Sequence, residues 1–360
     1  MAYDLGNEEL NERLRSLIAD SSGNDNQDLI EELIVTALKL HRDGATRGDL
    51  KLINTAVKEM RYSNLVFSRH DEPKVTIFGS ARTPQDDPNY ELTVELAAMM
   101  ASHGWGIITG AGPGIMEAGA KGAGMENSFG VNIRLPFEAS ANEYLADGRT
   151  VNFKYFFTRK LGFVKESQAF VIMPGGFGTL DEAFELITLI QTGKSDLHPI
   201  VLLEAEGTGY WKPLIGFTTE ILLGKGMISD SDLALFLQTT DPLEACNHIL
   251  KFYSNYHSQR FTAGKLILRL RQAPTETELA RLNEDFSDII VEGGIERAEP
   301  NQAEVEDGDA LDMERVTLYF DRRHFGRLRQ LIDRLNDLAS LPETTEIPHG
   351  ISEEQAERPW

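Results

Sequence analysis

The chain has 360 residues, 41% of them hydrophobic, which is enough to bury at least one sizeable core and excludes a mainly disordered protein. Its formal net charge of −22 argues against nucleic acid or an anionic membrane as a partner, because a field of that sign repels polyphosphate. The single cysteine, Cys246, cannot form an internal disulfide, and the sequence has neither a leader-like start nor a run of about 18 apolar residues. We therefore expect a cytoplasmic protein.

Residues 1–71 carry apolar side chains at helical spacing among charged ones, as at Leu29, Leu33, Ala37 and Leu40. This pattern predicts a helical N-terminal extension, which would serve as a cap or as an oligomerisation arm.

Residues 72–255 alternate helical patterns with short apolar runs that are bounded by Gly or Pro. The runs are "KVTIFGSAR", "GWGIITGAGPG", "FGVNIRLP", "QAFVIMPGG" and "HPIVLLE". Strands that are apolar on both faces are typical of a parallel sheet covered by helices on each side. The segment is therefore predicted to be a Rossmann-like α/β domain.

Residues 256–341 have a different pattern. "KLILRLR" and "RVTLYF" alternate like strands, and a helix opens with a capping box of Thr275 and Glu278. With a strand at 294–297 and a last helix, the order β, α, β, β, α resembles a small ferredoxin-like or ACT-like α+β domain. The acidic stretch from Glu299 to Asp312 is typical of a solvated loop, and residues 342–360 are typical of a disordered tail.

Three glycine-rich loops follow successive apolar runs: "FGSAR" at 78–82, "TGAGPG" at 109–114 and "PGGFGT" at 174–179. In an open parallel sheet, such loops lead into helix N-termini whose unpaired N–H groups hold phosphate without a basic side chain. One glycine loop would indicate only a turn. Three of them favour a phosphate-bearing ligand.

Commoner nucleotide motifs do not fit. The loop at 109–114 lacks the GxGxxG spacing, and "GKS" at 193–195 is preceded by Thr188 where a P-loop would have its first glycine. The eight histidines form no HExxH and there is no CxxC, so the sequence predicts no metal site and no cofactor.

The segment "PGGFGTLDE" at 174–182 is similar to the PGGxGTxxE motif of the Lonely Guy family. These phosphoribohydrolases split nucleoside 5′-monophosphates, such as AMP or cytokinin nucleotides, into a base and ribose 5-phosphate. The resemblance covers about residues 50–255 and includes "FGSAR", "GAGPGIMEAGAKGA", "GVNIRLPFE" and "FTRK". Related sequences are often labelled lysine decarboxylases, but no pyridoxal-lysine context is recognisable here. Ala111 and the unit from 264 onward depart from the short plant-type enzymes and leave the preferred base open.

The resemblance implies that Arg159 and Glu182 are the catalytic pair, and that the enzyme is a homodimer or larger homo-oligomer. The substrate-binding set that we predict is Gly79, Ser80, Gly112, Gly114, Glu117, Lys160, Gly175, Gly176, Gly178 and Thr179. Cleaving an N-glycosidic bond builds positive charge on the ribose C1′, so a carboxylate below the sugar and a cation beside the base suit this chemistry.

Simpler interpretations exist for each of these features. Thr179 and Glu182 have the spacing of a capping box, Arg159 could be a packing residue on an aromatic-rich helix, and Glu117 could face solvent. The basic residues at 322–329 fit an exposed charged face more simply than an effector-phosphate site. The alternative function is a carrier or sensor that binds a nucleotide on the same fold without hydrolysing it.

Overall fold

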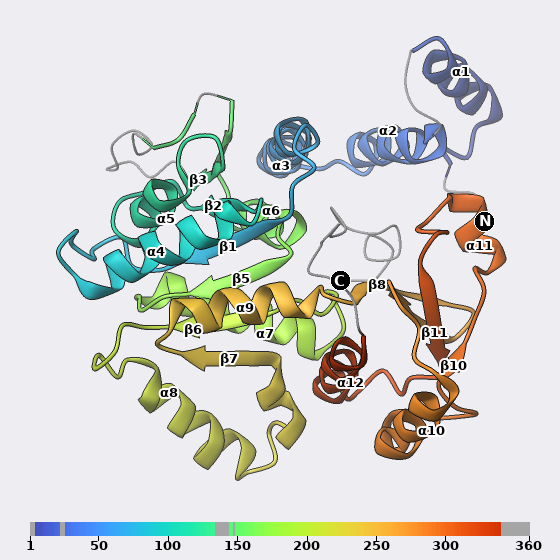
Figure 1. Cartoon of the computed structure of the whole chain (residues 1–360). Coiled ribbons are helices and arrows are strands. Elements are labelled where there is room, and N and C mark those ends of the chain that lie inside the picture. The colour runs from blue at the N-terminus through green and yellow to red at the C-terminus, as the bar shows by residue number, and fades with distance from the viewer. Residues whose placement is uncertain (1–3, 22–25, 134–143, 147, 340–360) are drawn as a thin grey trace. The chain divides into compact units, whose positions relative to one another are not determined.

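The computed structural model describes residues 4–21, 26–133, 144–146 and 148–339 (Figure 1). The predicted tail at 342–360 lies outside these residues. The chain divides into two compact units, one up to Arg61 and the other from Tyr62 onward. The domain boundaries expected from the sequence stay a prediction.

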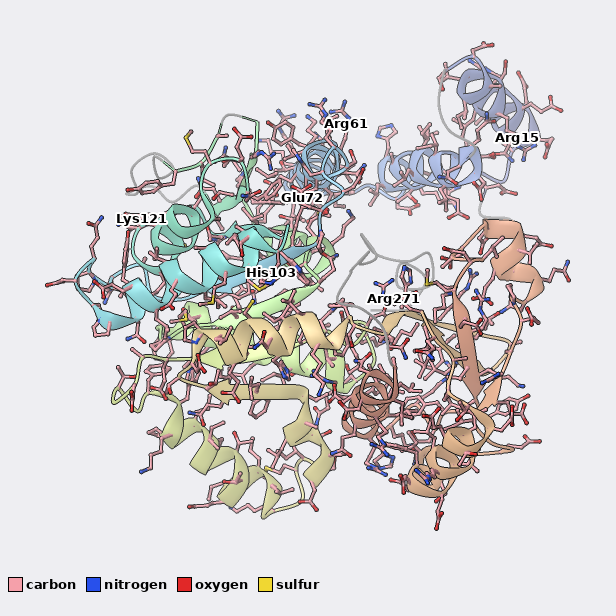
Figure 2. The ribbon with its side chains drawn as sticks, viewed as in Figure 1. Arg15, Arg61, Glu72, His103, Lys121 and Arg271 are labelled. Atoms are coloured by element: carbon pink, nitrogen blue, oxygen red, sulfur yellow. The ribbon has the colours of Figure 1, made fainter. Side chains whose placement is uncertain are left out.

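The first unit is helical. It holds α1 (Glu8–Ala19), α2 (Gln27–Arg42) and most of α3 (Arg47–Phe67). Leu14, Ile18 and Val35 form its small core, and Arg15 of α1 donates to Glu31 of α2 at 3.2 Å (Figure 2 labels Arg15). Other apolar side chains of this unit are exposed: Leu10, Leu17, Leu29, Ile30, Leu33, Leu38, Leu50, Leu52 and Val57. The helical extension is confirmed, although much of its apolar surface is left uncovered.

The second unit is built on a seven-stranded parallel sheet with the order β4-β3-β2-β1-β5-β6-β7 (Figure 1). The strands are β1 (Lys74–Phe78), β2 (Gly106–Thr109), β3 (Ser128–Ile133), β4 (Thr150–Phe153), β5 (Ala169–Ile172), β6 (Ile200–Leu203) and β7 (Phe236–Thr239). Every residue of β1, β2, β5 and β6 is buried, which is why the sequences of these strands are mostly apolar. The Rossmann-like prediction is confirmed.

Helices alternate with these strands along the chain. They are α4 (Pro88–Ser102), α5 (Ile115–Ala123), α6 (Phe156–Glu166), α7 (Phe177–Gln191), α8 (Trp211–Phe217) and α9 (Pro242–Phe252), with a π-helical turn at Thr218–Leu223 and a 3-10 turn at Asp230–Leu235. Within the described residues, no helix is both long and apolar enough to cross a membrane.

The strand order reverses between β1 and β5. From β1 the chain builds outward through β2, β3 and β4 on one side, and β5, β6 and β7 then extend the other side. The backbone N–H of Ser80 donates to the carbonyl of Pro174 at 3.1 Å, so the loops after β1 and β5 are joined. Such a switch point is where open α/β sheets bind ligands, because the flanking loops diverge to leave a crevice.

A second, antiparallel sheet has the order β10-β11-β9-β8 (Figure 1). Its strands are β8 (Tyr256–Thr262), β9 (Lys265–Leu270), β10 (Glu296–Arg297) and β11 (Glu314–Leu318), and its helices are α10 (Glu276–Asp285), α11 (Gln302–Asp307) and α12 (Phe325–Leu338), with a 3-10 turn at Ser287–Ile289. In a ferredoxin-like β-α-β-β-α-β module the last strand lies beside the first. Here β8, which precedes β9 in the chain, takes that edge through a hairpin.

The acidic stretch from Glu299 to Asp312 was predicted to be a solvated loop, but it is not simply a loop. It contains α11, which starts with a capping box of Asn301 and Glu304. Glu304 is fully buried and accepts a hydrogen bond from Arg269 Nε of β9 at 2.9 Å. The acidic composition suggested exposure to solvent. One of the acids is buried instead, because a buried arginine in the sheet requires a buried carboxylate partner. The other predicted capping box, Thr275 with Glu278, is confirmed.

Three of the five basic residues at 322–329, namely Arg322, Arg323 and His324, are exposed as predicted, whereas Arg327 and Arg329 are not. Arg327 donates to both carboxylate oxygens of Asp288, at 2.8 and 2.9 Å. Arg329 is buried, donates to Asp333 at 3.0 Å and lies over the Phe252 ring of α9. The Asp288 pair and the Phe252 contact attach α12 to its surroundings, whereas Asp333 lies on α12 itself.

Candidate functional site

A cleft of about 710 Å³ opens beside the switch point between β1 and β5. It is walled by the three glycine loops and by the first turns of α6 and α7. Nine of the twelve residues predicted for the site line it: Gly79, Ser80, Gly112, Arg159, Gly175, Gly176, Gly178, Thr179 and Glu182. Residues separated by about a hundred positions in the chain therefore share one cavity.

Two glycines are required by close approaches, one between two loops and one within the third loop. Gly114 has φ +66°, and a Cβ there would lie 2.4 Å from the carbonyl oxygen of Ser80. A Cβ on Gly175 would lie 2.1 Å from the Thr179 hydroxyl. Gly114 therefore joins the first two loops and is not part of the cleft lining, whereas Gly175 lets the third loop turn tightly into α7.

Helix α7 begins earlier than the motif suggested. Its N-cap is Gly176, which has no side chain to bond the first-turn N–H groups, and Thr179 and Glu182 are its third and sixth residues. The capping-box interpretation of this pair is therefore wrong. A helix start capped by glycine leaves its N–H groups and positive dipole end directed at the cleft, which suits an anionic group.

Glu182 is the carboxylate of the cleft, and its side chain is only 12% exposed. Burial raises its pKa to about 7; Lys160 and Arg159 act in the opposite direction, while Glu185 and Asp181 add to the increase. A carboxylic acid with this pKa exchanges its proton near neutral pH, as general acid–base catalysis requires.

Arg159 is held against the end of β3. Its Nε donates to the Val131 carbonyl at 2.9 Å, and its guanidinium lies 5.2 Å from the centre of the Phe163 ring. The side chain thus packs on the α6 aromatics and also faces the cleft. The environment of Arg159 therefore fits in part a packing residue and in part a residue of the site.

Two other predicted residues lie outside the lining. Lys160 follows Arg159 on α6, but its ammonium reaches Asp181 at 2.8 Å on α7. Glu117 on α5 accepts hydrogen bonds from Tyr90 at 2.9 Å and Gln85 at 2.6 Å. Contact of these two residues with a substrate stays a prediction.

One part of the cleft, which is aromatic, was not predicted from the sequence. Phe156 at the start of α6 is 54% exposed and Phe177 at the start of α7 is 93% exposed, and both line the cavity beside Met116 and Ile133. Phe177 occupies the variable position of PGGxGTxxE, which could have signalled it. No spacing rule pointed to the others.

Residues 110–249 match a family model described as "Possible lysine decarboxylase". A probable cytokinin riboside 5′-monophosphate phosphoribohydrolase of Oryza sativa subsp. japonica is 30% identical over 126 residues, covering 35% of this chain and 50% of that protein. A cytokinin riboside 5′-monophosphate phosphoribohydrolase of Arabidopsis thaliana is 46% identical over 59 residues, covering 16% and 26%. The chain thus spans half or less of the length of these two relatives.

Among solved structures, the molybdenum cofactor carrier protein of Chlamydomonas reinhardtii is 19% identical with a TM-score of 0.33, covering 49% of this chain and 94% of that one. The sheet topology and the cleft by themselves define a Rossmann-like protein with a cleft at the switch point of its sheet. The matches to named relatives are more specific. They confirm, for the sheet domain, the Lonely Guy resemblance predicted from the motif at 174–182.

Proposed function

We propose that the protein hydrolyses the N-glycosidic bond of nucleoside 5′-monophosphates, of the AMP or cytokinin type, to a free base and ribose 5-phosphate. The observation that carries the proposal is the position of Glu182. A nearly buried carboxylate whose pKa is about 7 lines the same cleft as Arg159 and the glycine-capped start of α7. The names of the relatives support the same reaction.

The 5′-phosphate would lie on the third loop. Gly176 and Gly178 carry no side chain, and a Cβ at either would have no neighbour within 4 Å, so the approach to the helix start is open. Ser80 adds a hydroxyl from the joined first loop. Backbone N–H groups and the α7 dipole would offset the phosphate charge, even though the chain carries a net charge of −22.

The base would lie toward the aromatic part of the cleft. Phe156 and Phe177 line the cavity and keep much of their ring surface exposed. Aromatic rings gain stacking energy with any nucleobase, about 1–3 kcal/mol per base. Stacking tolerates several bases, so the selection between AMP and a cytokinin nucleotide would depend on the remaining apolar wall, which includes Met116 and Ile133.

At the reacting bond, positive charge develops on C1′ as the base departs. Ionised Glu182 would stabilise this centre and orient or deprotonate the attacking water. Arg159 would hold the substrate and stabilise the departing base. Its guanidinium is preoriented by the hydrogen bond to Val131, so little reorganisation is needed.

We propose that the working form is a homodimer or larger homo-oligomer in the cytoplasm. Exposed leucines of the N-terminal helices, such as Leu29 and Leu33, and exposed Phe184 of α7 offer apolar surface for a second copy. Light scattering tests the assembly. An active monomer would contradict it.

The function is tested by incubating the protein with a panel of nucleoside 5′-monophosphates and separating free base by chromatography. Release of base and ribose 5-phosphate in equal amounts supports the proposal. Tight binding of a nucleotide without product would favour the alternative of a carrier or sensor.

A further inference from the structure

Consecutive residues of α6 reach two different places. The guanidinium of Arg159 donates to Val131 at the end of β3, on the cleft side. The ammonium of Lys160 turns to α7, where it meets Asp181, Glu182 and Glu185. Lys160, which we predicted from the sequence to be a substrate contact, is therefore occupied by protein carboxylates.

One cation is shared by three acids. Lys160 Nζ lies 2.8 Å from Asp181 Oδ2 and 3.9 Å from Glu182 Oε2, and it makes a short hydrogen bond to Glu185. The Lys160 side chain is 14% exposed and that of Glu182 is 12% exposed, whereas Asp181 and Glu185 are open to solvent. The two outer acids hold the ammonium more closely than the buried one does.

Other charged groups near Glu182 are few among the described residues. Arg159 faces it from α6, and Arg82 lines the cleft from the loop after β1. Glu117 of α5 is engaged by Tyr90 and Gln85. The cluster of Lys160, Asp181 and Glu185 is thus the main group of charges beside Glu182 that substitutions can change.

We propose that Lys160 is a positioning residue that, shared with Asp181 and Glu185, sets the orientation and the protonation state of Glu182 without touching the substrate. The inference rests on the proposed function, in which the ionised form of Glu182 acts. It replaces the substrate contact expected for Lys160 by a role within the protein.

Substitutions at Lys160 and at Glu185 should shift the pKa of Glu182 in opposite directions. Removing the ammonium leaves three carboxylates within two turns of α7, so the buried one takes up a proton more readily. Removing the charge of Glu185 strengthens the interaction of the Lys160 ammonium with Glu182. The ionised form of Glu182 is then favoured. In the parent protein, Lys160 lowers the pKa of Glu182 and Glu185 raises it, in agreement with these expectations.

The experiment measures kcat/KM from pH 5 to 9, with AMP or the panel nucleotide that releases base fastest, for the parent and three variants. Lys160→Met should move the acidic limb up by about one pH unit, Glu185→Gln should move it down, and Lys160→Arg should restore the parent profile. Lys165→Met is the matched control, because Lys165 lies on the same helix and pairs with Glu166 away from the cleft. It should leave the limb unchanged.

A second measurement is independent of turnover. The carboxyl ¹³C resonance of Glu182, assigned by its loss in Glu182→Gln, is titrated by NMR in each variant. Opposite shifts in Lys160→Met and Glu185→Gln support the inference even if no nucleotide is hydrolysed, in which case only the proposed function fails. An unshifted titration in both variants overturns the inference. A raised KM in Lys160→Met with an unmoved acidic limb also overturns it and assigns Lys160 to substrate binding.

Discussion

The backbone N–H of Ser80 donates to the carbonyl of Pro174 at 3.1 Å, which joins the glycine loops after β1 and β5. The joined loops and the start of α7 form one wall of the cleft. If this wall holds the 5′-phosphate, binding energy from that remote group positions the reacting bond. We expect kcat/KM for AMP to exceed that for adenosine by at least about 10²-fold, measured by release of adenine. Equal values would contradict a phosphate site on these loops.

Activity should depend on pH through Glu182. Its pKa is raised to about 7, so the ionised form grows as pH rises through neutrality. We expect kcat/KM to increase about tenfold per unit below pH 6 and to level off above about pH 8. The control is Glu182→Gln, whose residual rate should lack this limb. A parent profile that stays flat from pH 5 to 8 would contradict the assignment.

The raised pKa of Glu182 should also make the stability of the fold depend on pH. A carboxyl whose pKa is raised in the folded state stabilises the fold in its neutral form. That contribution is complete below the unfolded value of 4.5 and is lost as pH rises through about 7. Glu182→Gln keeps a neutral side chain, so its free energy of unfolding should exceed that of the parent by about 1–3 kcal/mol at pH 8. Thermal melts at pH 5 and pH 8 check this. A difference that does not grow with pH would contradict it.

Gly193 lies just after the end of α7 and closely approaches α12. This residue has φ +67°, and a Cβ there would lie 2.1 Å from the Phe325 ring of α12. We expect Gly193→Ala to destabilise the protein by at least about 1 kcal/mol, because both the backbone strain and the clash oppose it. Gly207→Ala is the control, since it has a similar positive φ but no neighbour within 4 Å. Equal losses in denaturant melts would mean that packing on Phe325 adds nothing.

Five strands of the central sheet were predictable, because strands buried on both faces are mostly apolar and are bounded by glycine or proline. The two edge strands, β4 and β7, were not among the predicted runs. The edge strand β8 was not predicted. Its sequence "YHSQRFT" is largely polar and only half-buried, and its pairing with β9 comes from a hairpin. Helix α11 was missed for a related reason: its acids suggested solvent, but Glu304 is buried against Arg269.

The site was predictable where glycine loops mark the ends of parallel strands, since those ends meet at one edge. Its finer features depend on where helices begin and where side chains point. The capping-box interpretation failed because α7 starts at Phe177 on a glycine N-cap. Spacing alone could not tell that adjacent Arg159 and Lys160 point to different partners.

The proposed function depends above all on catalysis by the Glu182 carboxylate. Glutamine has nearly the same size and is compatible with the interior of α7, but it cannot supply negative charge beneath a forming cation or take a proton from water. The most direct test is the single-turnover rate of base release by Glu182→Gln, with nucleotide binding measured by calorimetry on the same sample. We expect unchanged binding and a rate lowered by about 10²–10⁴. A near-normal rate in the folded variant would contradict it.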